Sequence, residues 1–140
     1  MWLKNVDPSR TEIYRRRSQC LHEAMLFLVD DLDAYDAAVA LLAVHCAISL
    51  NDAVQIAATG KRSRYENHSQ TLSDLEGICR ANRIDIRGIA HLRWLLTKKT
   101  AISYGDRRFT DAALARDKAE RFQSWAYSSF REELRAQEYS

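Results

Sequence analysis

One short segment, residues 60–68, concentrates the side chains that could carry out acid–base and phosphate chemistry. Three cations and a hydroxyl stand in consecutive positions there: Lys61, Arg62, Ser63 and Arg64. Loop amides beside the start of a helix favour bound anions, and a guanidinium can hold a phosphate through two parallel hydrogen bonds. His68 is the histidine of this segment, and imidazole titrates near neutral pH. The segment predicts a phosphate site in which Arg62 binds the anion and His68 transfers a proton, with a solvated basic loop as the alternative.

A polar stripe interrupts the most apolar part of the chain. His45, Ser49 and Asp52 are spaced i, i+4 and i+7, so they share one face of a helix. Buried polar groups need partners, so we expect a polar group from another helix to face them. The functional interpretation is a pocket wall. The alternatives are an internal hydrogen-bonded network and a polar strip at a dimer seam.

Lys99 and Tyr104 form a third candidate group, at the end of a predicted helix. Lys99 lies near the apolar face, so its ammonium should either reach solvent or meet a carboxylate such as Asp52. Together with Tyr104 it could contribute a cation and a phenol to a phosphate or nucleotide site. The alternative is a lysine favoured at the carboxyl end of a helix by the helix dipole.

Composition excludes several other classes of protein. The formal net charge of +2 is low for a non-specific nucleic-acid binder, so RNA contact would need a local basic patch. With four glycines, the chain lacks phosphate-binding and dinucleotide-binding loops, and it has neither zinc-ligand spacing nor another cofactor motif. The three cysteines are far apart, which predicts buried, reduced thiols. We expect a cytoplasmic protein with no membrane span, no metal and no cofactor.

Helical spacing of apolar residues runs through most of the 140 residues. It predicts helices over about 7–32, 33–59, 69–81 and 88–104, and a fifth from Thr110, with 60–68 as a loop. Asp7 should cap the first helix and Gly60 should end the second. Short connections between long helices predict a single all-α domain, an up-and-down antiparallel bundle of four to five helices. Its core should cover about 7–131, and residues 132–140 should fray.

The chain resembles one family over most of its length. The stretch 40–53, followed by Gly60-Lys61-Arg62-Ser63 and Asn67-His68, is similar to bacterial HEPN-domain proteins. So are residues 95–104 and the helix that contains 119–126. The resemblance implies a bundle of four to five helices that usually forms a homodimer.

The resemblance also implies a function. Many HEPN proteins are metal-independent RNases in toxin–antitoxin or phage-defence systems, with an R-x(4–6)-H motif whose histidine activates the ribose 2′-OH while its arginine stabilises the phosphorane. The spacing that matches here is Arg62 followed by five residues and His68. Other family members lack the motif and bind nucleotides or partner proteins, such as an antitoxin or a nucleotidyltransferase. The resemblance therefore implies either an RNase effector or a non-catalytic RNA- or nucleotide-binding or dimerisation module.

Overall fold

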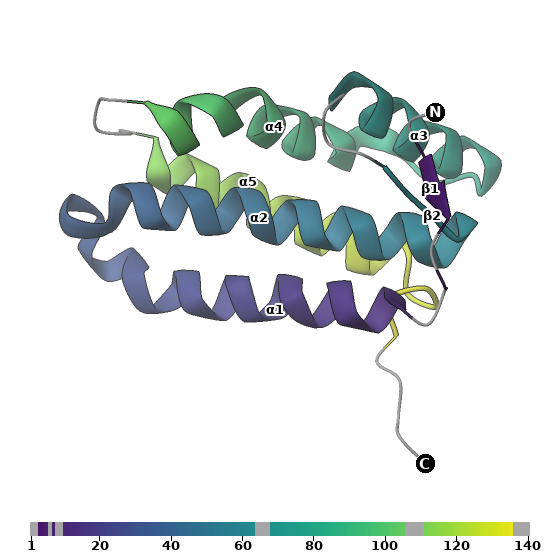
Figure 1. Ribbon diagram of the computed structural model, residues 1–140, viewed down its shortest axis with the longest axis horizontal. Helices are drawn as coiled ribbons and strands as arrows, with labels where there is room; N and C mark the ends of the chain where they lie inside the picture. Colours follow the sequence, from purple (N-terminus) through teal and green to yellow (C-terminus); the bar gives the residue numbers. More distant parts are fainter. Residues whose placement is uncertain (1–2, 6, 8–9, 64–67, 106–110, 136–140) are drawn as a thin grey trace, which may run out of the picture.

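The computed structural model describes residues 3–5, 7, 10–63, 68–105 and 111–135, and these residues form a helical bundle (Figure 1). Long helices that follow one another along the chain run antiparallel, and a shorter helix lies at one end of the bundle. The long helices are α1 (Thr11–Leu28), α2 (Leu32–Thr59), α4 (Ile89–Tyr104) and α5 (Ala112–Ser129), and the shorter one is α3 (His68–Ala81). The prediction of an all-α, up-and-down bundle is confirmed.

Helix α2 is the central element, as its apolar sequence predicted. It packs against α1, α4 and α5, and its side chains Val39, Ala43, Leu50 and Val54 are almost fully buried. The helix begins after Asp31, whose carboxylate accepts a hydrogen bond from the Ala34 amide at 3.3 Å. It ends at Gly60, which adopts φ 70° and donates its N–H to the Ile56 carbonyl. Only glycine takes this left-handed conformation without strain, so the predicted end of the helix is confirmed.

The start of the first helix differs from the prediction. Helix α1 begins at Thr11 with Arg10 as its N-cap, so the predicted cap at Asp7 lies before the start of the helix. The Asp7 backbone carbonyl accepts a hydrogen bond from the Arg10 amide at 2.9 Å. The start is held by an ionic cluster, since Glu12 receives two hydrogen bonds from Arg15, at 2.7 and 2.6 Å. The Arg15 side chain is only 12% exposed. Its guanidinium also interacts with the Tyr127 side chain, so Arg15 links α1 to α5.

The basic segment after α2 was predicted to be a loop, but part of it is a strand. Residues Lys61–Ser63 form strand β2, which pairs antiparallel with strand β1, Leu3–Asn5. This two-stranded ribbon lies beside the end of α2 (Figure 1). Period-2 patterning cannot be recognised in three residues, so neither strand could be predicted from the sequence.

The carboxyl-terminal part of the bundle extends further than expected. Helix α5 begins after Asp111, and the predicted cap Thr110 lies outside the described residues. Beyond the helix, the Leu134 amide donates to the Phe130 carbonyl, and the Leu134 side chain is buried in the core. The prediction that residues 132–140 fray is therefore wrong for residues 132–135, and residues 136–140 lie outside the described residues.

The cysteines correct one prediction, and the apolar content of the helices adds one observation. Cys46 and Cys79 are buried as predicted, but Cys20 is exposed on α1. One helical stretch within Thr11–Thr59 is long and apolar enough to cross a membrane, judged by length and composition alone. Most of that window is buried inside the fold, and the core helix of a soluble protein gives the same signal.

Candidate functional site

The polar face of α2 is divided between an exposed and a buried part. His45 is exposed, whereas Ser49 and Asp52 are only 5% and 4% exposed. Because the three residues follow helical spacing, they form one strip that leads from solvent into the fold. The prediction that they share a face is confirmed. The prediction was a partner from another helix, and the ion pair described for Asp52 is with Arg62 of strand β2.

Arg62 joins that strand to two helices. Its Nε lies 3.5 Å from Oδ2 of Asp52, and its Nη1 donates a 2.6 Å hydrogen bond to the Tyr14 hydroxyl. The guanidinium also stands 5.1 Å from the centre of the Tyr14 ring, while Arg17 lies 5.0 Å from the same ring. Cation–π contacts of this kind and a charge-assisted hydrogen bond hold the side chain in place. Arg62 therefore has a positioning role, yet its side chain remains 37% exposed.

A second group of basic side chains comes from three helices. His45 is on α2, His68 is the first residue of α3, and Lys99 is on α4. Partial loss of hydration lowers the pKa of both histidines, and the nearby Lys99 ammonium lowers each further. Since both values fall below the usual 6.5, both imidazoles are mainly neutral at pH 7. The group thus combines two neutral imidazoles with one cation, next to the N-terminus of α3, where the helix dipole favours anions.

The buried network beneath α3 was not anticipated from the sequence. Asn51 Nδ2 and Gln55 Nε2 each donate to the Thr71 hydroxyl at 3.2 Å, and Gln55 Nε2 also donates to the Asn51 side-chain oxygen at 3.0 Å. All three side chains are almost fully buried. The i, i+4 spacing of two amide side chains within an apolar helix was the available signal. This network holds α3, and with it His68, against α2.

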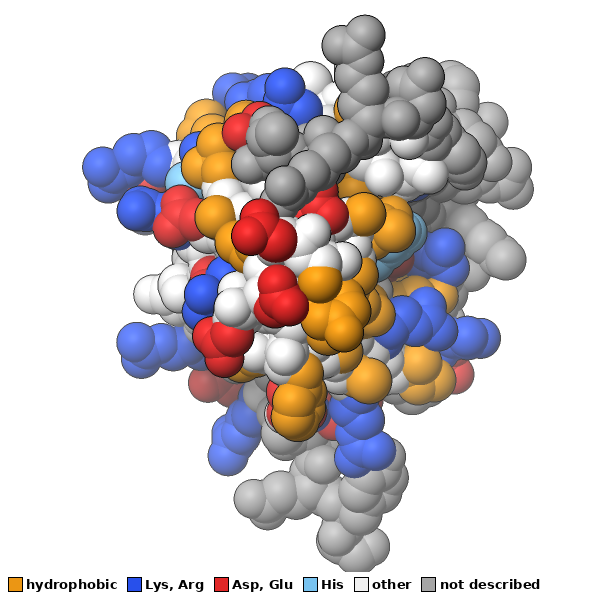
Figure 2. Space-filling view, turned by 90° about the vertical axis from the view of Figure 1, so that its left-hand side faces the viewer, with side chains coloured by type: hydrophobic (Ala, Val, Ile, Leu, Met, Phe, Trp, Pro, Cys, Tyr) orange, Lys and Arg blue, Asp and Glu red, His pale blue; other side chains and the backbone are white. Residues whose placement is uncertain are grey.

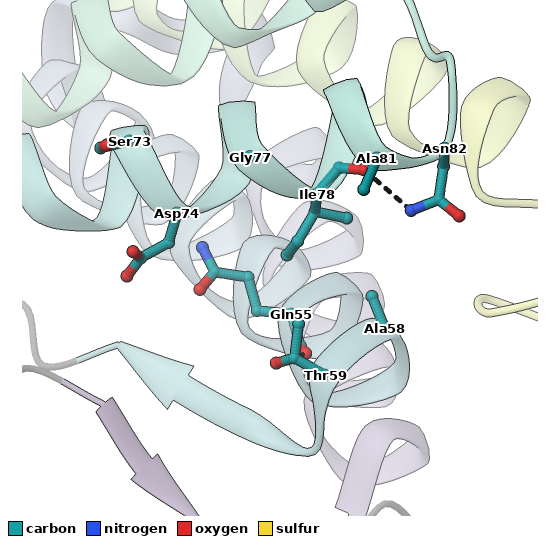
Figure 3. Close-up of a pocket in the computed structure, with 9 residues that line it drawn as sticks. All are labelled: Gln55, Ala58, Thr59, Ser73, Asp74, Gly77, Ile78, Ala81 and Asn82. Atoms are coloured by element: carbon teal, nitrogen blue, oxygen red, sulfur yellow. Dashed lines mark hydrogen bonds between the residues drawn. The ribbon is translucent and has the colours of Figure 1, made fainter.

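A pocket opens on the other side of the same contact (Figure 3). Its volume is about 410 Å³, and small side chains of α2 and α3, among them Ala58, Ser73 and Gly77, make up much of its wall. Gln55 and Asp74 face each other across it, and Asn82 donates to the Ile78 carbonyl at its far end. The volume and the amide groups suit a small polar ligand such as a nucleobase.

The remaining predicted residues are placed only in part. Lys61 is exposed, and its amide is bound by the Thr59 hydroxyl at 3.1 Å. Ser63 ends strand β2 and Tyr104 ends helix α4, but the side chains of both lie outside what the structure describes. Arg64 lies outside the described residues altogether. The structure thus places Lys99 near enough to His45 and to His68 to lower the pKa of each, and separately joins Asp52 to Arg62.

Comparison with known proteins adds no assignment, since no family model, curated protein or solved structure matches this chain.

Proposed function

We propose that this protein is a HEPN-like endoribonuclease that needs no metal, and that His45, His68 and Lys99 carry its chemistry. The observation behind the proposal is that one ammonium, on Lys99, acts electrostatically on two imidazoles of lowered pKa. Cleavage of RNA next to a 2′-hydroxyl requires a base, an acid and a cation for the phosphorane, and these three side chains supply one of each.

The reaction follows from that division of roles. His68, in its neutral form, takes the proton of the ribose 2′-hydroxyl while the 2′-oxygen attacks the neighbouring phosphorus. His45, in its protonated form, gives a proton to the 5′-oxygen as the P–O5′ bond breaks. The products are a 2′,3′-cyclic phosphate and a free 5′-hydroxyl. Lys99 stabilises the charge that builds on the phosphoryl oxygens, and the dipole of α3 acts in the same direction.

The basic strand β2 would extend the binding surface along the RNA backbone. The accessible part of the Arg62 guanidinium and the exposed Lys61 can each contact a phosphate. Arg62 acts at the same time through its bonds to Asp52 and Tyr14, which fix the strand against the bundle. We propose that Ser63, Arg64 and Tyr104 also contribute to RNA binding, a proposal that rests on the sequence alone.

In the cell, we propose that the protein is a cytoplasmic, dimeric toxin or defence effector that an antitoxin or a nucleotidyltransferase controls. This part of the proposal rests on the resemblance to HEPN-domain proteins. The chemistry of the basic group is independent of it.

The second candidate is a non-catalytic module that binds a nucleotide or RNA. Two observations favour it. The guanidinium of Arg62 is already engaged by Asp52 and Tyr14, and the pocket between α2 and α3 offers room for a base. In this case the basic group would hold a phosphate without cutting the chain.

The deciding experiment is RNA cleavage by the full chain in EDTA, with the products separated by length and end group. We expect cleavage to 2′,3′-cyclic phosphates, and a loss of at least about 100-fold in His68→Ala, because general acid–base catalysis contributes about 10²–10⁴-fold. His91→Ala is the matched control, since His91 lies on α4 near Lys118 and Arg121 of α5. If folded wild-type protein binds RNA without cutting it, the RNase proposal is wrong and the non-catalytic binding module is the better assignment.

A further inference from the structure

The outer face of α1 carries apolar side chains at a regular interval. Ile13 is 48% exposed and Phe27 is 87% exposed, and the exposed Cys20 lies midway between them in the sequence. The buried side of the same helix includes Tyr14 and Met25. A spacing of seven residues is two helical turns, so the three exposed residues form a stripe opposite the core, about 10 Å apart along the helix. Exposure of a phenylalanine to this extent marks an interaction surface.

Charges along this face change sign from one half to the other. Arg16 and Arg17 are exposed in the first half, and Glu23 in the second, with exposed Asp30 just beyond the helix. Between Phe27 and Glu23 the surface is hollowed, with a volume of about 390 Å³. Figure 2 looks onto the end of the bundle where α1 meets α2, and it shows hydrophobic side chains gathered beside acidic ones.

We propose that this face of α1 binds the same face of a second copy of the chain, with the two α1 helices antiparallel and the twofold axis at Cys20. Residues at equal distances on either side of Cys20 then meet. Ile13 and Phe27 are each seven positions from it, so Ile13 of one copy lies against Phe27 of the other and fills the adjacent hollow.

Charge complementarity is what selects a second copy as the occupant. In the same register Arg16 comes within one residue of the position opposite Glu23 of the other copy. The Arg16 side chain is 56% exposed, and its Nε also pairs with Glu12 of its own helix at 3.0 Å, so the contact with Glu23 would add a second partner. The twofold axis repeats this pair, so the interface gains two ion pairs beside two apolar contacts. An antiparallel arrangement is required, because parallel helices would place Arg16 against Arg16 and Glu23 against Glu23. The face is thus self-complementary in both charge and shape.

This inference deepens the proposed function, which includes a dimer, by identifying the surface that forms it. The residues of the basic group belong to α2, α3 and α4, so the α1 face leaves them outside the interface. A test of association therefore does not depend on catalysis, and a test of catalysis does not depend on this interface.

Cys20 provides the first test, because it is the exposed cysteine and the thiols of Cys46 and Cys79 are buried. Helices that pack 8–10 Å apart bring facing Cα atoms at the axis close to the roughly 4.4–6.8 Å that a disulfide spans. We expect copper–phenanthroline oxidation of the full chain to give a covalent dimer on non-reducing gels. Cys20→Ser should abolish it, and Cys79→Ser should leave it unchanged.

Charge exchange provides the second test, with mass measured by analytical ultracentrifugation. Arg16→Glu and Glu23→Arg should each weaken the dimer at least about 10-fold, and the double variant should restore it. Phe27→Glu should give a monomer, whereas Leu114→Glu, at an exposed apolar position on α5, should not. The proposal would be overturned if the wild-type protein were a monomer at every concentration measured, over a 100-fold range up to its solubility limit. It would also be overturned by a dimer that Phe27→Glu leaves intact. Neither result would bear on RNA cleavage.

Discussion

Gly88 and Gly77 offer a matched pair of substitutions with opposite expected effects. At Gly88 an added Cβ would lie 2.0 Å from Cγ of Trp125, far inside van der Waals contact. The indole is held on three sides, by a 2.9 Å hydrogen bond from its Nε1 to the Asp85 carbonyl and by the rings of Phe122 and Phe130 at 5.6 and 5.8 Å. It therefore has to shift when alanine replaces Gly88.

The magnitude follows from the contacts that the shift disturbs. Overpacking costs about 1–3 kcal/mol, and loss of the indole hydrogen bond adds about 1 kcal/mol. Alanine brings no gain in helix propensity here, because Gly88 is the N-cap of α4, where glycine is favoured over alanine. We expect Gly88→Ala to lower the free energy of unfolding by at least about 2 kcal/mol, and 2 kcal/mol is a fall in Tm of about 4–8 °C for a domain of this size.

Gly77→Ala is the control, because no atom lies within 4 Å of the added Cβ in the middle of α3. It should raise the free energy of unfolding by about 0.5–1 kcal/mol through helix propensity alone. Thermal unfolding followed by circular dichroism and by tryptophan fluorescence measures both variants. If Gly88→Ala unfolds at the wild-type temperature, or if the two variants shift together, the packing of Trp125 on Gly88 is not as described.

Four further outcomes are expected. The pH profile of kcat/KM for RNA cleavage should have its maximum below pH 6.5, because catalysis needs one neutral and one protonated imidazole and both pKa values are lowered; a maximum above pH 7.5 would contradict the assignment. In Lys99→Gln, NMR titration should show higher pKa values for His45 and His68, since a positive charge has been removed. Unchanged pKa values would show that Lys99 does not act on the two histidines. Thr71→Val should lower the free energy of unfolding by about 1–3 kcal/mol in denaturant titrations, because two buried amide groups lose an acceptor. Glu12→Gln should reduce the loss of stability on acidification: hydrogen bonding to its arginine partner depresses the Glu12 pKa, so its contribution is present above pH 4.5 and disappears as the pH falls through the folded-state value.

The helices could be predicted from the sequence because their signals are local. The end of α2 at Gly60 follows from one glycine, and the central place of α2 follows from its apolar circumference. The two strands could not be predicted in this way. Each has three residues, and the pairing of Lys4 with Arg62 depends on the tertiary fold.

The candidate site was predictable as a set of residue types but not as a set of contacts. Helical spacing placed His45 and Asp52 on one face, and that face exists. The partners of these residues come from other elements. Arg62 reaches Asp52 only because strand β2 lies beside α2, and Lys99 approaches His45 only because α4 packs on α2. Contacts between distant parts of the chain are set by packing, which the sequence pattern of one element does not encode.

Cys20 illustrates the same limit. Its apolar neighbours in the sequence predicted burial, but helical rotation turns it outward, away from the side of α1 where Ser18 donates a 2.8 Å hydrogen bond to the Cys46 carbonyl. A change of two positions along a helix is a rotation of about 200°, so a small difference in the orientation of α1 decides which side chains are buried.

The ribbon of β1 and β2 has a consequence for how the protein opens. A two-stranded ribbon is marginally stable by itself, so its amides should exchange with solvent deuterium before those of the helix cores. When the ribbon separates, Arg62 loses the backbone support that holds it next to Asp52 and Tyr14. Residues 3–5 would then control access to a carboxylate on α2 nearly fifty positions away along the chain. We therefore expect a local opening of this bundle that begins with its first strand and exposes the polar face of its central helix.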